Sequence, residues 1–399
     1  MSLRTRFLSL LALRWLATGL LMPVSLLLPL ERGLTVAEVG LAMAAQGVVV
    51  IVLEVPSGAL SDAWGRRPVF VASALLAITA YAVTFLAQSL AAFAVAWAIS
   101  GVFRALDSGP LESWFVDAEN ARGAAHEVPR GLAAAGGVIS ASIAAGSLAS
   151  AGLLWLAPWG TEATLAAPYL VAIGVVLVQV LCAWLLMDPV RAEAAPTLGA
   201  WRETLVTGVK VAFGRRLRLL SAAMALVGVS VAALELMMPV RLEEFAADAS
   251  DAASTLGVVS SVAWGLAALG AAVTTRALRL VGPAFLAPVL FVVEGLGLLA
   301  MAAAGGVGVL VAGYWLCYLV HTSSGAMYNS LVHDRVSDAQ RGTALSVASM
   351  AFLGAGAAGG VTLGALADEA GASASLVVGG TLMVLAALMV VGAVRPRQR

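Results

Sequence analysis

The sequence predicts an all-α membrane protein with twelve transmembrane helices in two halves of six. Its 399 residues are 61% hydrophobic and 12% charged, with a mean hydropathy of +0.96, which is not the composition of a soluble globular protein. Apolar runs near the ~20 residues that a helix needs to cross a membrane recur along the chain. The longest polar stretch, 188–216, separates the halves 1–187 and 217–399. We expect this linker to be cytoplasmic, with an amphipathic segment from Trp201 to Phe213 at the membrane surface.

Twelve apolar runs define the predicted spans. The first run lacks a small-residue cleavage site and ends in Glu31 and Arg32, so we interpret it as a spanning helix and not as a removed signal. The predicted spans are 9–30, 37–60, 69–88, 91–117, 131–157, 163–187, 217–240, 254–274, 283–303, 307–332, 342–366 and 372–394.

The basic residues predict the orientation, because cytoplasmic loops of membrane proteins carry an excess of Lys and Arg. With the N-terminus inside, 20 of the 23 basic residues lie inside or at the inner edge. Only Arg32 and Arg241 fall outside, and Arg104 falls within a span. The acidic loop from Glu243 to Asp248 is then external. Both termini are expected to be cytoplasmic, which agrees with an even number of spans.

Composition and motifs also exclude several classes of function. The formal net charge is zero and no basic run suggests a nucleic-acid partner. Cys182 and Cys317 lie inside apolar runs, which favours small core residues over a disulfide or metal site. The three histidines are too scattered for a zinc site. We find no Ser-His-Asp or Cys-His arrangement and no nucleotide-binding loop, so we expect neither an enzyme, nor a cofactor, nor ATP as the energy source.

A short charged turn between the second and third spans carries the most specific motif. It reads Gly58-x-x-x-Asp62-x-x-Gly65-Arg66-Arg67. A tight turn accounts for the glycines, but it does not explain an acid four residues before a pair of arginines. The motif resembles the loop 2–3 signature of the major facilitator superfamily. A generic positive cytoplasmic loop is the alternative.

The resemblance implies a fold of two six-helix halves and a latch on the cytoplasmic side. In that family the acid of the motif, here Asp62, caps a helix of the other half in the inward-closed state. The first arginine, here Arg66, pairs with an acid at the cytoplasmic end of helix 4, here Asp117. Arg67 is an alternative partner for Asp117. The segment Gly270 to Arg276 was expected to be the corresponding loop 8–9, in a form that lacks the acid.

The fourth predicted span contains charges that are costly inside a membrane, at about 2.5–3.5 kcal/mol or more each. Arg104, Asp107 and Glu112 fall within about a 140° arc of a helix, and we expect this face to line a hydrated cavity. Asp107 follows Arg104 by three residues, close enough for an intrahelical ion pair. A self-neutralising structural pair is the alternative. Pro110 is expected to bend this helix. Arg104 and Gly109 also resemble the helix 4 signature that the family associates with proton-coupled transport.

Further titratable residues lie in other spans. Glu54, near the inner end of the second span, is a cavity candidate or a structural acid bonded to a neighbouring helix. Glu235 and Glu294 are lone acids in apolar surroundings, where a carboxyl group can carry a proton. We favour Glu235 as the proton carrier, because helix 7 lines the cavity in the resembled family and helix 9 is peripheral. A histidine side chain ordinarily titrates near pH 6.5, which makes His321 a further proton-carrier candidate. A satisfied core histidine is its alternative role.

Small residues and adaptable side chains give weaker indications of helix movement and of a substrate-binding surface. Glycines crowd the fifth and eleventh spans, where small residues allow close packing and sliding of helices. Gly137 and Gly146 resemble the start of the family's antiporter signature, although Ser150-Ala151 stands where Gly-Pro should follow. We expect an adaptable apolar lining from aromatic, methionine and histidine side chains. These substrate-lining candidates are Met237, Met238, Tyr314, Tyr318 and His321.

Together these features predict a secondary active transporter that couples proton movement to export of small amphipathic organic compounds, as a multidrug-type antiporter, by alternating access. The alternatives are a proton-coupled importer of an apolar metabolite, and a lipid-flipping or non-transporting protein with the same fold. The expected partners are a small-molecule substrate, protons and the lipid bilayer, without nucleic acid, and the chain is expected to act as a monomer. The expected location is a bacterial-type inner membrane.

Overall fold

The computed structural model describes residues 1–157, 159–188, 217–336 and 338–394, and all regular structure in them is helical. The predicted linker and its amphipathic segment lie outside the described residues, as do the side chains of Glu54 and Asp62 and the surroundings of Gly58. The elements are α1 (Leu3–Leu21), α2 (Leu27–Glu31), α3 (Val36–Trp64), α4 (Arg66–Leu86), α5 (Leu90–Asp107), α6 (Pro110–Ala121), η1 (Ala125–Glu127), α7 (Val128–Leu156), α8 (Thr161–Leu186), α10 (Arg218–Glu243), α11 (Ala249–Val281), α12 (Pro283–Ala302), α13 (Val307–His333), α14 (Asp338–Ala370) and α15 (Ala372–Val394).

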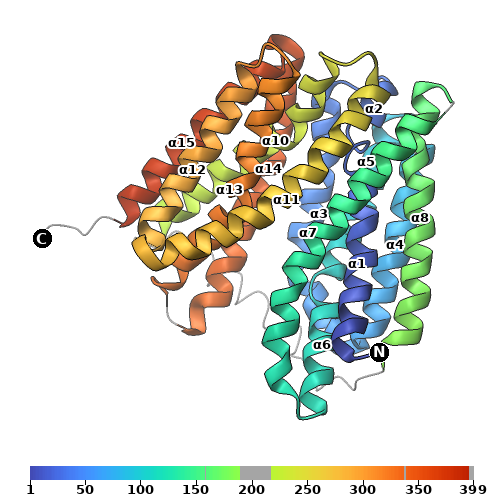
Figure 1. Ribbon diagram of the computed structural model, residues 1–399, viewed down its shortest axis with the longest axis vertical. Helices are drawn as coiled ribbons and strands as arrows, with labels where there is room; N and C mark the ends of the chain where they lie inside the picture. Colours follow the sequence, from blue (N-terminus) through green and yellow to red (C-terminus); the bar gives the residue numbers. More distant parts are fainter. Residues whose placement is uncertain (158, 189–216, 337, 395–399) are drawn as a thin grey trace, which may run out of the picture. The chain divides into compact units, whose positions relative to one another are not determined.

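Eleven stretches of the described chain are long and apolar enough to cross a membrane. The helix at the position of the first predicted span, α1, also carries Arg4, Arg6 and Arg14. It ends at Leu21, and a turn separates it from the short helix α2. With α1 in first place, the order of long helices is the predicted one, and the all-α fold class is confirmed (Figure 1).

The helices pack into two compact units. Within the first unit, α1 packs on α7 and α8, and α4 packs on α5 and α8. Within the second, α10 packs on α14 and α15, and α12 packs on α13 and α15. The units do not coincide with the two sequence halves, because Thr35–Gly47 belongs to the second unit and Ala247–Trp264 to the first. The division of the chain at the linker therefore remains a prediction.

A single glycine with positive φ makes the turn between α3 and α4. Gly65 has φ 92°, a conformation that glycine adopts without steric cost, and Arg66 begins the next helix. The corresponding turn in the second half is made by Gly282, with φ 72°, followed at once by Pro283. The predicted loop 8–9, Gly270 to Arg276, is wrong, because α11 continues through it to Val281. Composition alone did not show where this long helix ends.

The fourth predicted span is broken, not bent. Its first part, α5, ends at Asp107, and its second part, α6, begins at Pro110. Gly109 has φ 98° and stands at the N-cap of α6, while Pro110 occupies the first helical turn, where its missing N–H costs nothing. The break therefore places two helix ends, with their unpaired backbone groups, inside a membrane-spanning segment.

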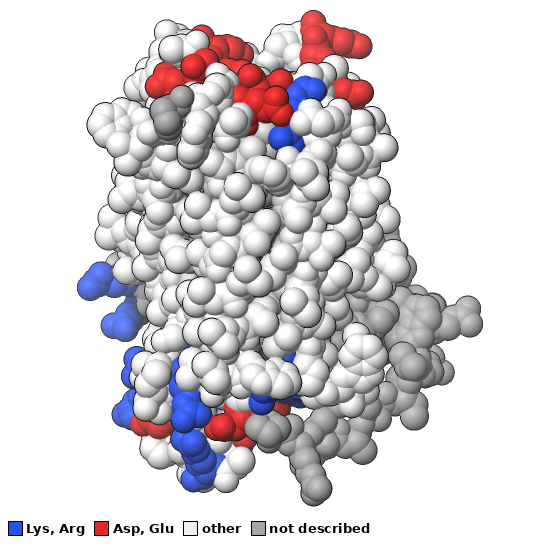
Figure 2. Space-filling view, turned by 90° about the vertical axis from the view of Figure 1, so that its right-hand side faces the viewer, with Lys and Arg blue, Asp and Glu red and all other residues white. Residues whose placement is uncertain are grey.

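The distribution of surface charge fits a membrane protein. On the face drawn in Figure 2, Lys, Arg, Asp and Glu lie mainly toward the two ends, and the band between them is largely uncharged. One end of this face is rich in acidic side chains, whereas most basic ones lie in the other part.

Candidate functional site

The structure brings together the arginine and the acid of the predicted cytoplasmic latch. Arg66 Nε donates to Asp117 Oδ2 at 3.3 Å, and its NH1 group donates to Ser61 Oγ at 3.2 Å. Arg66 begins α4 and Asp117 lies on α6, so the contact joins the predicted third and fourth spans. Asp62 lies in the last turns of α3, but its side chain is outside the described residues, so its capping role remains a prediction.

The second arginine of the motif has a different partner. The Arg67 guanidinium lies 3.9 Å above the ring of Trp184, and its NH1 group donates to the carbonyl of Met187 at 3.3 Å. Both contacts are at the C-terminal end of α8, where a cation is favoured by the helix dipole. The carboxylate of Asp188, just beyond α8, accepts from Arg6 NH1 at 3.0 Å. This end of the first unit is thus fastened by arginines from α1 and α4.

Inside the first unit, Arg14, Thr18 and Asp107 form a group that we call the N-terminal polar cluster. Arg14 Nε donates to Asp107 Oδ2 at 2.6 Å, and its NH1 group donates to Thr18 Oγ1 at 2.7 Å. The guanidinium also lies 4.5 Å from the ring of Phe103 and 4.9 Å from that of Trp15. The exposed fractions of the Arg14 and Asp107 side chains are only 9% and 14%.

The N-terminal polar cluster bears on the predicted pairing of Asp107. Asp107 is ion-paired with Arg14 of α1, a partner on another helix that the prediction did not name. Arg104 and Asp107 both lie within α5, so their i, i+3 spacing holds; the break before Pro110 instead removes the single helical arc on which Glu112 was grouped with them. Arg104 and Glu112 are both exposed, on either side of the break between α5 and α6. Each is placed favourably for the dipole of its own helix, Arg104 in the last turn of α5 and Glu112 in the first turn of α6.

In the second unit, Glu294, His321 and Ser324 form the C-terminal polar cluster. The Glu294 side chain, on α12, has no exposed surface. Its Oε1 atom lies 2.7 Å from His321 Nδ1, and its Oε2 atom accepts from Ser324 Oγ at 3.2 Å, both partners being on α13. The His321 side chain is 32% exposed, so the pair has one wholly buried member and one accessible member.

Glu235 of α10 belongs to the surroundings of this cluster. It is exposed, and it lies close enough to His321 and Tyr318 to interact electrostatically with both. The remaining predicted lining residues are buried in the packing of the second unit. Met237 and Met238 are at most 1% exposed, and Tyr314 packs against Tyr318 with ring centroids 4.7 Å apart. The structure therefore gathers Glu235, Tyr318 and His321, while the role of the two methionines as substrate contacts remains a prediction.

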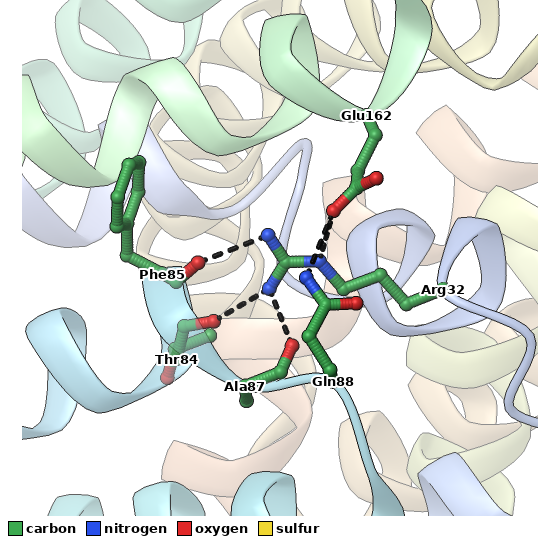
Figure 3. A network of polar contacts seen from close by, with 6 residues as sticks. All are labelled: Arg32, Thr84, Phe85, Ala87, Gln88 and Glu162. Carbon is green, nitrogen blue, oxygen red and sulfur yellow. Dashed lines mark hydrogen bonds and ion pairs between the residues drawn. The ribbon is translucent and has the colours of Figure 1, made fainter.

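Arg32 is one of the two arginines predicted to lie outside, and it holds the C-terminal end of α4 (Figure 3). Its NH1 group donates to the carbonyls of Thr84 and Ala87 at 3.0 and 2.6 Å, and NH2 donates to that of Phe85 at 2.9 Å. Its Nε atom donates to Glu162 Oε1 at 2.9 Å. Arg32 thus satisfies carbonyls that a helix end leaves without partners.

Arg241, the other predicted external arginine, occupies the equivalent place in the second half. It lies in the last turn of α10, pairs with Glu244, and donates from NH2 to the carbonyl of Ala304 at 2.6 Å, just beyond α12. In each half, an arginine just after the first predicted span therefore binds the C-terminal end of the third long helix. This correspondence is a structural sign of the internal repeat.

The N-terminal end of α3 is held by an acid on α14. The backbone N–H groups of Val36 and Ala37 donate to Asp368 Oδ1 and Oδ2 at 3.0 and 2.9 Å. Nearby, Gly40 and Gly360 bring the two helices so close that a Cβ atom on Gly40 would collide with the Gly360 backbone. By the predicted orientation, this contact lies on the external side.

Sequence reasoning missed Arg14 and undervalued Glu294. Arg14 was placed at the inner edge because the first span was taken to begin at residue 9. With the helix beginning at Leu3, Arg14 lies three turns into it, roughly 17 Å along its axis. No periodic signal links Glu294 to His321, which lie 27 residues apart on different helices.

Comparison with known proteins decides the family. The sequence profile described as Major Facilitator Superfamily matches residues 7–333, which is most of the chain. The chain belongs to the major facilitator superfamily. It is therefore a multi-pass secondary transporter of a small molecule and not an enzyme, as the loop 2–3 motif predicted. Comparison with curated protein sequences finds no match.

Solved structures of other major facilitator proteins have the same fold. A variant of the nucleoside transporter NupG has a TM-score of 0.85 at 13% identity, with 98% of this chain and 100% of that one covered. The human organic anion transporter MFSD10 (TETRAN) has a TM-score of 0.66 at 20% identity, with coverage of 97% and 98%. A POT family transporter in complex with a thioalcohol-conjugated peptide has a TM-score of 0.72 at 14% identity, with coverage of 98% and 95%. At these identities the likeness concerns the fold alone.

Proposed function

We propose that this major facilitator protein exports small amphipathic organic compounds by alternating access and that proton movement drives the export. The observation that carries the proposal is the C-terminal polar cluster. A carboxyl group without exposed surface, among membrane-spanning helices, is paired with a partly accessible histidine. Glu235 stands beside them.

The physical argument concerns the cost of charge in an apolar setting. An unpaired ionised carboxyl group inside membrane-spanning helices is unfavourable by several kcal/mol, so it is paired or it binds a proton. His321 contacts Glu294 and lies within electrostatic reach of Glu235, so a proton that binds to this group changes its net charge. A change in the accessibility of His321 or Glu235 changes the affinity of the group for that proton. Proton binding can then shift the balance between two conformations, as coupling requires.

The composition of the spans supports an amphipathic substrate. Few amide side chains lie in or near the predicted spans, namely Gln46, Gln88, Gln179 and Asn329. Sugars need many such hydrogen-bonding groups, whereas an apolar lining with a few acids suits drugs, dyes or secondary metabolites. An importer of an apolar metabolite would use the same lining, and counterflow in vesicles with an imposed pH gradient separates the two directions.

The latch residues are proposed to hold the cytoplasmic side closed in one of the two conformations. Arg66 with Asp117 ties α4 to α6, and Asp62 is proposed to cap a helix of the other half when the cytoplasmic side closes. We propose that the protein resides as a monomer in a bacterial-type inner membrane with both termini in the cytoplasm. The basic residues support this orientation.

Ligand-induced stabilisation of the purified protein tests the proposal. A panel of organic cations and neutral amphiphiles is screened by melting temperature at pH 5.5 and pH 7.5. We expect at least one compound to raise the melting temperature by an amount that depends on pH, and this dependence to disappear in Glu235→Gln. Glu127→Gln, which changes a partly exposed acid paired with Arg130, is the matched control and should retain this pH dependence. The proposal fails if no compound stabilises the protein at either pH.

A further inference from the structure

We propose that Asp368 forms an external clamp, a contact that holds the start of α3 on α14 and opens when the transporter exposes its binding site to the outside. The clamp consists of the Asp368 carboxylate and the backbone N–H groups of Val36 and Ala37. This inference rests on the alternating access of the proposed function and names a residue that sets the balance between its two conformations. Asp62 is proposed to act on the cytoplasmic side, so the two acids hold opposite sides closed.

The first turn of α3 satisfies only part of its own backbone. Thr35 Oγ1 accepts from the Glu38 N–H at 3.2 Å, and Glu38 Oε2 accepts from the Thr35 N–H at 2.9 Å, which together form a capping box. The N–H groups of Val36 and Ala37 lie between these two and have no acceptor within their own helix. Asp368 Oδ1 and Oδ2 accept from them at 3.0 and 2.9 Å. The start of the helix is therefore completed by a side chain 331 residues after Ala37.

Asp368 is poorly placed for its own helix and well placed for α3. It lies in the last turn of α14, which ends at Ala370 and where the helix dipole disfavours a negative charge. The N-terminal end of α3 offers the opposite end of a dipole and two charge-assisted hydrogen bonds. Among the described residues, the Asp368 carboxylate has no other hydrogen-bond or ion-pair partner. The contact with α3 therefore compensates a charge that its own helix disfavours.

The helix surfaces that follow the clamp are made of small residues. A Cβ atom on Gly364 would lie 2.7 Å from the Val36 carbonyl oxygen, and one on Gly47 would lie 3.3 Å from the Cβ atom of Ala357. The contact is short, because only Thr35–Gly47 of α3 belongs to the second unit. Surfaces of small residues do not interlock, so they can part without unpacking either helix. Asp368 is exposed, so water can replace both of its hydrogen bonds when they do.

The size of the contribution from Asp368 suits a reversible clamp. A contact that exists in only one of two conformations favours that conformation by its own contribution and no more. Removal of a side chain that caps a helix typically shifts an equilibrium by about fivefold. We expect the same shift between the closed and the open state when Asp368 is removed. A bias of this size can be overcome by a substrate that binds the open state more tightly.

Cysteine labelling from the external side tests the clamp. Gly360→Cys places a thiol in the contact, at a buried position that faces Gly40 and has room for a Cβ atom. A membrane-impermeant maleimide is added to right-side-out vesicles without substrate or pH gradient, and the labelling rate reports the open fraction. Addition of Asp368→Ala should raise this rate about fivefold, and Asp368→Asn, which keeps one acceptor oxygen, should raise it less. Glu369→Ala, which removes the neighbouring exposed acid, is the matched control and should leave the rate unchanged.

The native Cys317 separates opening of the clamp from general loosening, because it is fully buried in the same unit and should stay unlabelled in every variant. The inference is overturned if Asp368→Ala leaves the labelling rate unchanged, if Glu369→Ala raises it equally, or if Cys317 becomes labelled as well. Labelling of Gly360→Cys only in inverted vesicles would overturn the external placement.

If Asp368→Ala does not fold, Asp368→Asn decides by the same criteria. These measurements use neither substrate nor a proton gradient, so their failure leaves proton-coupled export intact. Loss of the pH-dependent stabilisation would in turn leave the labelling result unchanged.

Discussion

Glu294, which has no exposed surface, lies with its Oε1 atom 2.7 Å from Nδ1 of His321 on the neighbouring helix. The two residues come from α12 and α13, which pack along each other in the second unit. Ser324 donates to the other carboxylate oxygen, so both acceptor atoms are satisfied. The pair therefore stabilises the contact between the helices only while both members are present.

We expect the single substitutions Glu294→Leu and His321→Leu each to lower the melting temperature strongly. Removal of one member leaves the other without its hydrogen-bond partner, at a cost of about 1–3 kcal/mol. The double variant should be markedly more stable than the sum of the two losses, because neither member is left without its partner. Additive losses in this double-mutant cycle would show that the two residues are not coupled.

The Arg32 network offers a comparison between a buried cation and its exposed partner. Arg32 is 4% exposed and Glu162 is 50% exposed. Arg32→Ala leaves three carbonyls at the end of α4 without their donor and should destabilise the protein by about 2–3 kcal/mol. Glu162→Gln should cost less than about 1 kcal/mol, since water screens an exposed pair. Thermal unfolding in detergent compares the two, and equal losses would contradict the capping role of Arg32.

Two facing glycines predict opposite results from the same substitution. A Cβ atom added to Gly40 would collide with the carbonyl group of Gly360, whereas one added to Gly360 would lie 3.7 Å from the nearest atom of Gly40. Gly40→Ala should therefore destabilise the packing of α3 on α14 by about 1–3 kcal/mol. Gly360→Ala serves as the matched control, with a melting temperature close to the wild-type value. The reverse order would mean that the two helices meet differently.

The Arg66–Asp117 contact should affect transport more than stability. The two side chains are 23% and 39% exposed, and such ion pairs contribute about 0–1 kcal/mol. If the pair belongs to a latch, Asp117→Asn should change the initial transport rate severalfold with little change in melting temperature. Glu127→Gln weakens the partly exposed pair of Glu127 with Arg130 at the start of α7 and should change neither quantity. A wild-type rate in Asp117→Asn would exclude the latch role of this pair.

Asp248 predicts a pH effect at the start of α11. Hydrogen bonds from Ser250 Oγ and from the Asp251 N–H lower the pKa of the Asp248 carboxyl group below its usual 3.8. A lowered pKa in the folded state means that the carboxylate adds stability above about pH 4 and loses this contribution as the pH falls through the folded-state value. Asp248→Asn should therefore be less stable than the wild type at pH 7, and the difference should shrink toward pH 3. A constant difference across this range would contradict the assignment.

The general architecture was predictable because membrane insertion constrains sequence strongly. Apolar length predicts a spanning helix, and the glycine turn at Gly65 with the arginines after it indicated the family. The pairing of Arg66 with Asp117 could be anticipated because the motif itself pointed to it. These signals are local, each within a few residues of the chain.

The polar clusters were harder to predict because they depend on contacts between distant helices. The partner of Asp107 could not be found by helical periodicity, because it is Arg14 on another helix, 93 residues earlier. Glu294 was assigned to a peripheral helix on the family pattern, and only packing showed that it meets His321. The capping role of Asp62 stays a prediction for a different reason. The motif points to this role clearly, but the side chain lies outside the described residues.

The most direct test of proton-coupled transport is substrate flux in proteoliposomes with an imposed pH gradient. The substrate is the compound that stabilises the purified protein most strongly. The account predicts that the gradient drives its accumulation by the wild-type protein and by Glu127→Gln, and that Glu235→Gln and Glu294→Gln allow only exchange without accumulation. Accumulation by both of these carboxyl variants at the wild-type level, or wild-type flux that does not respond to the gradient, would contradict it.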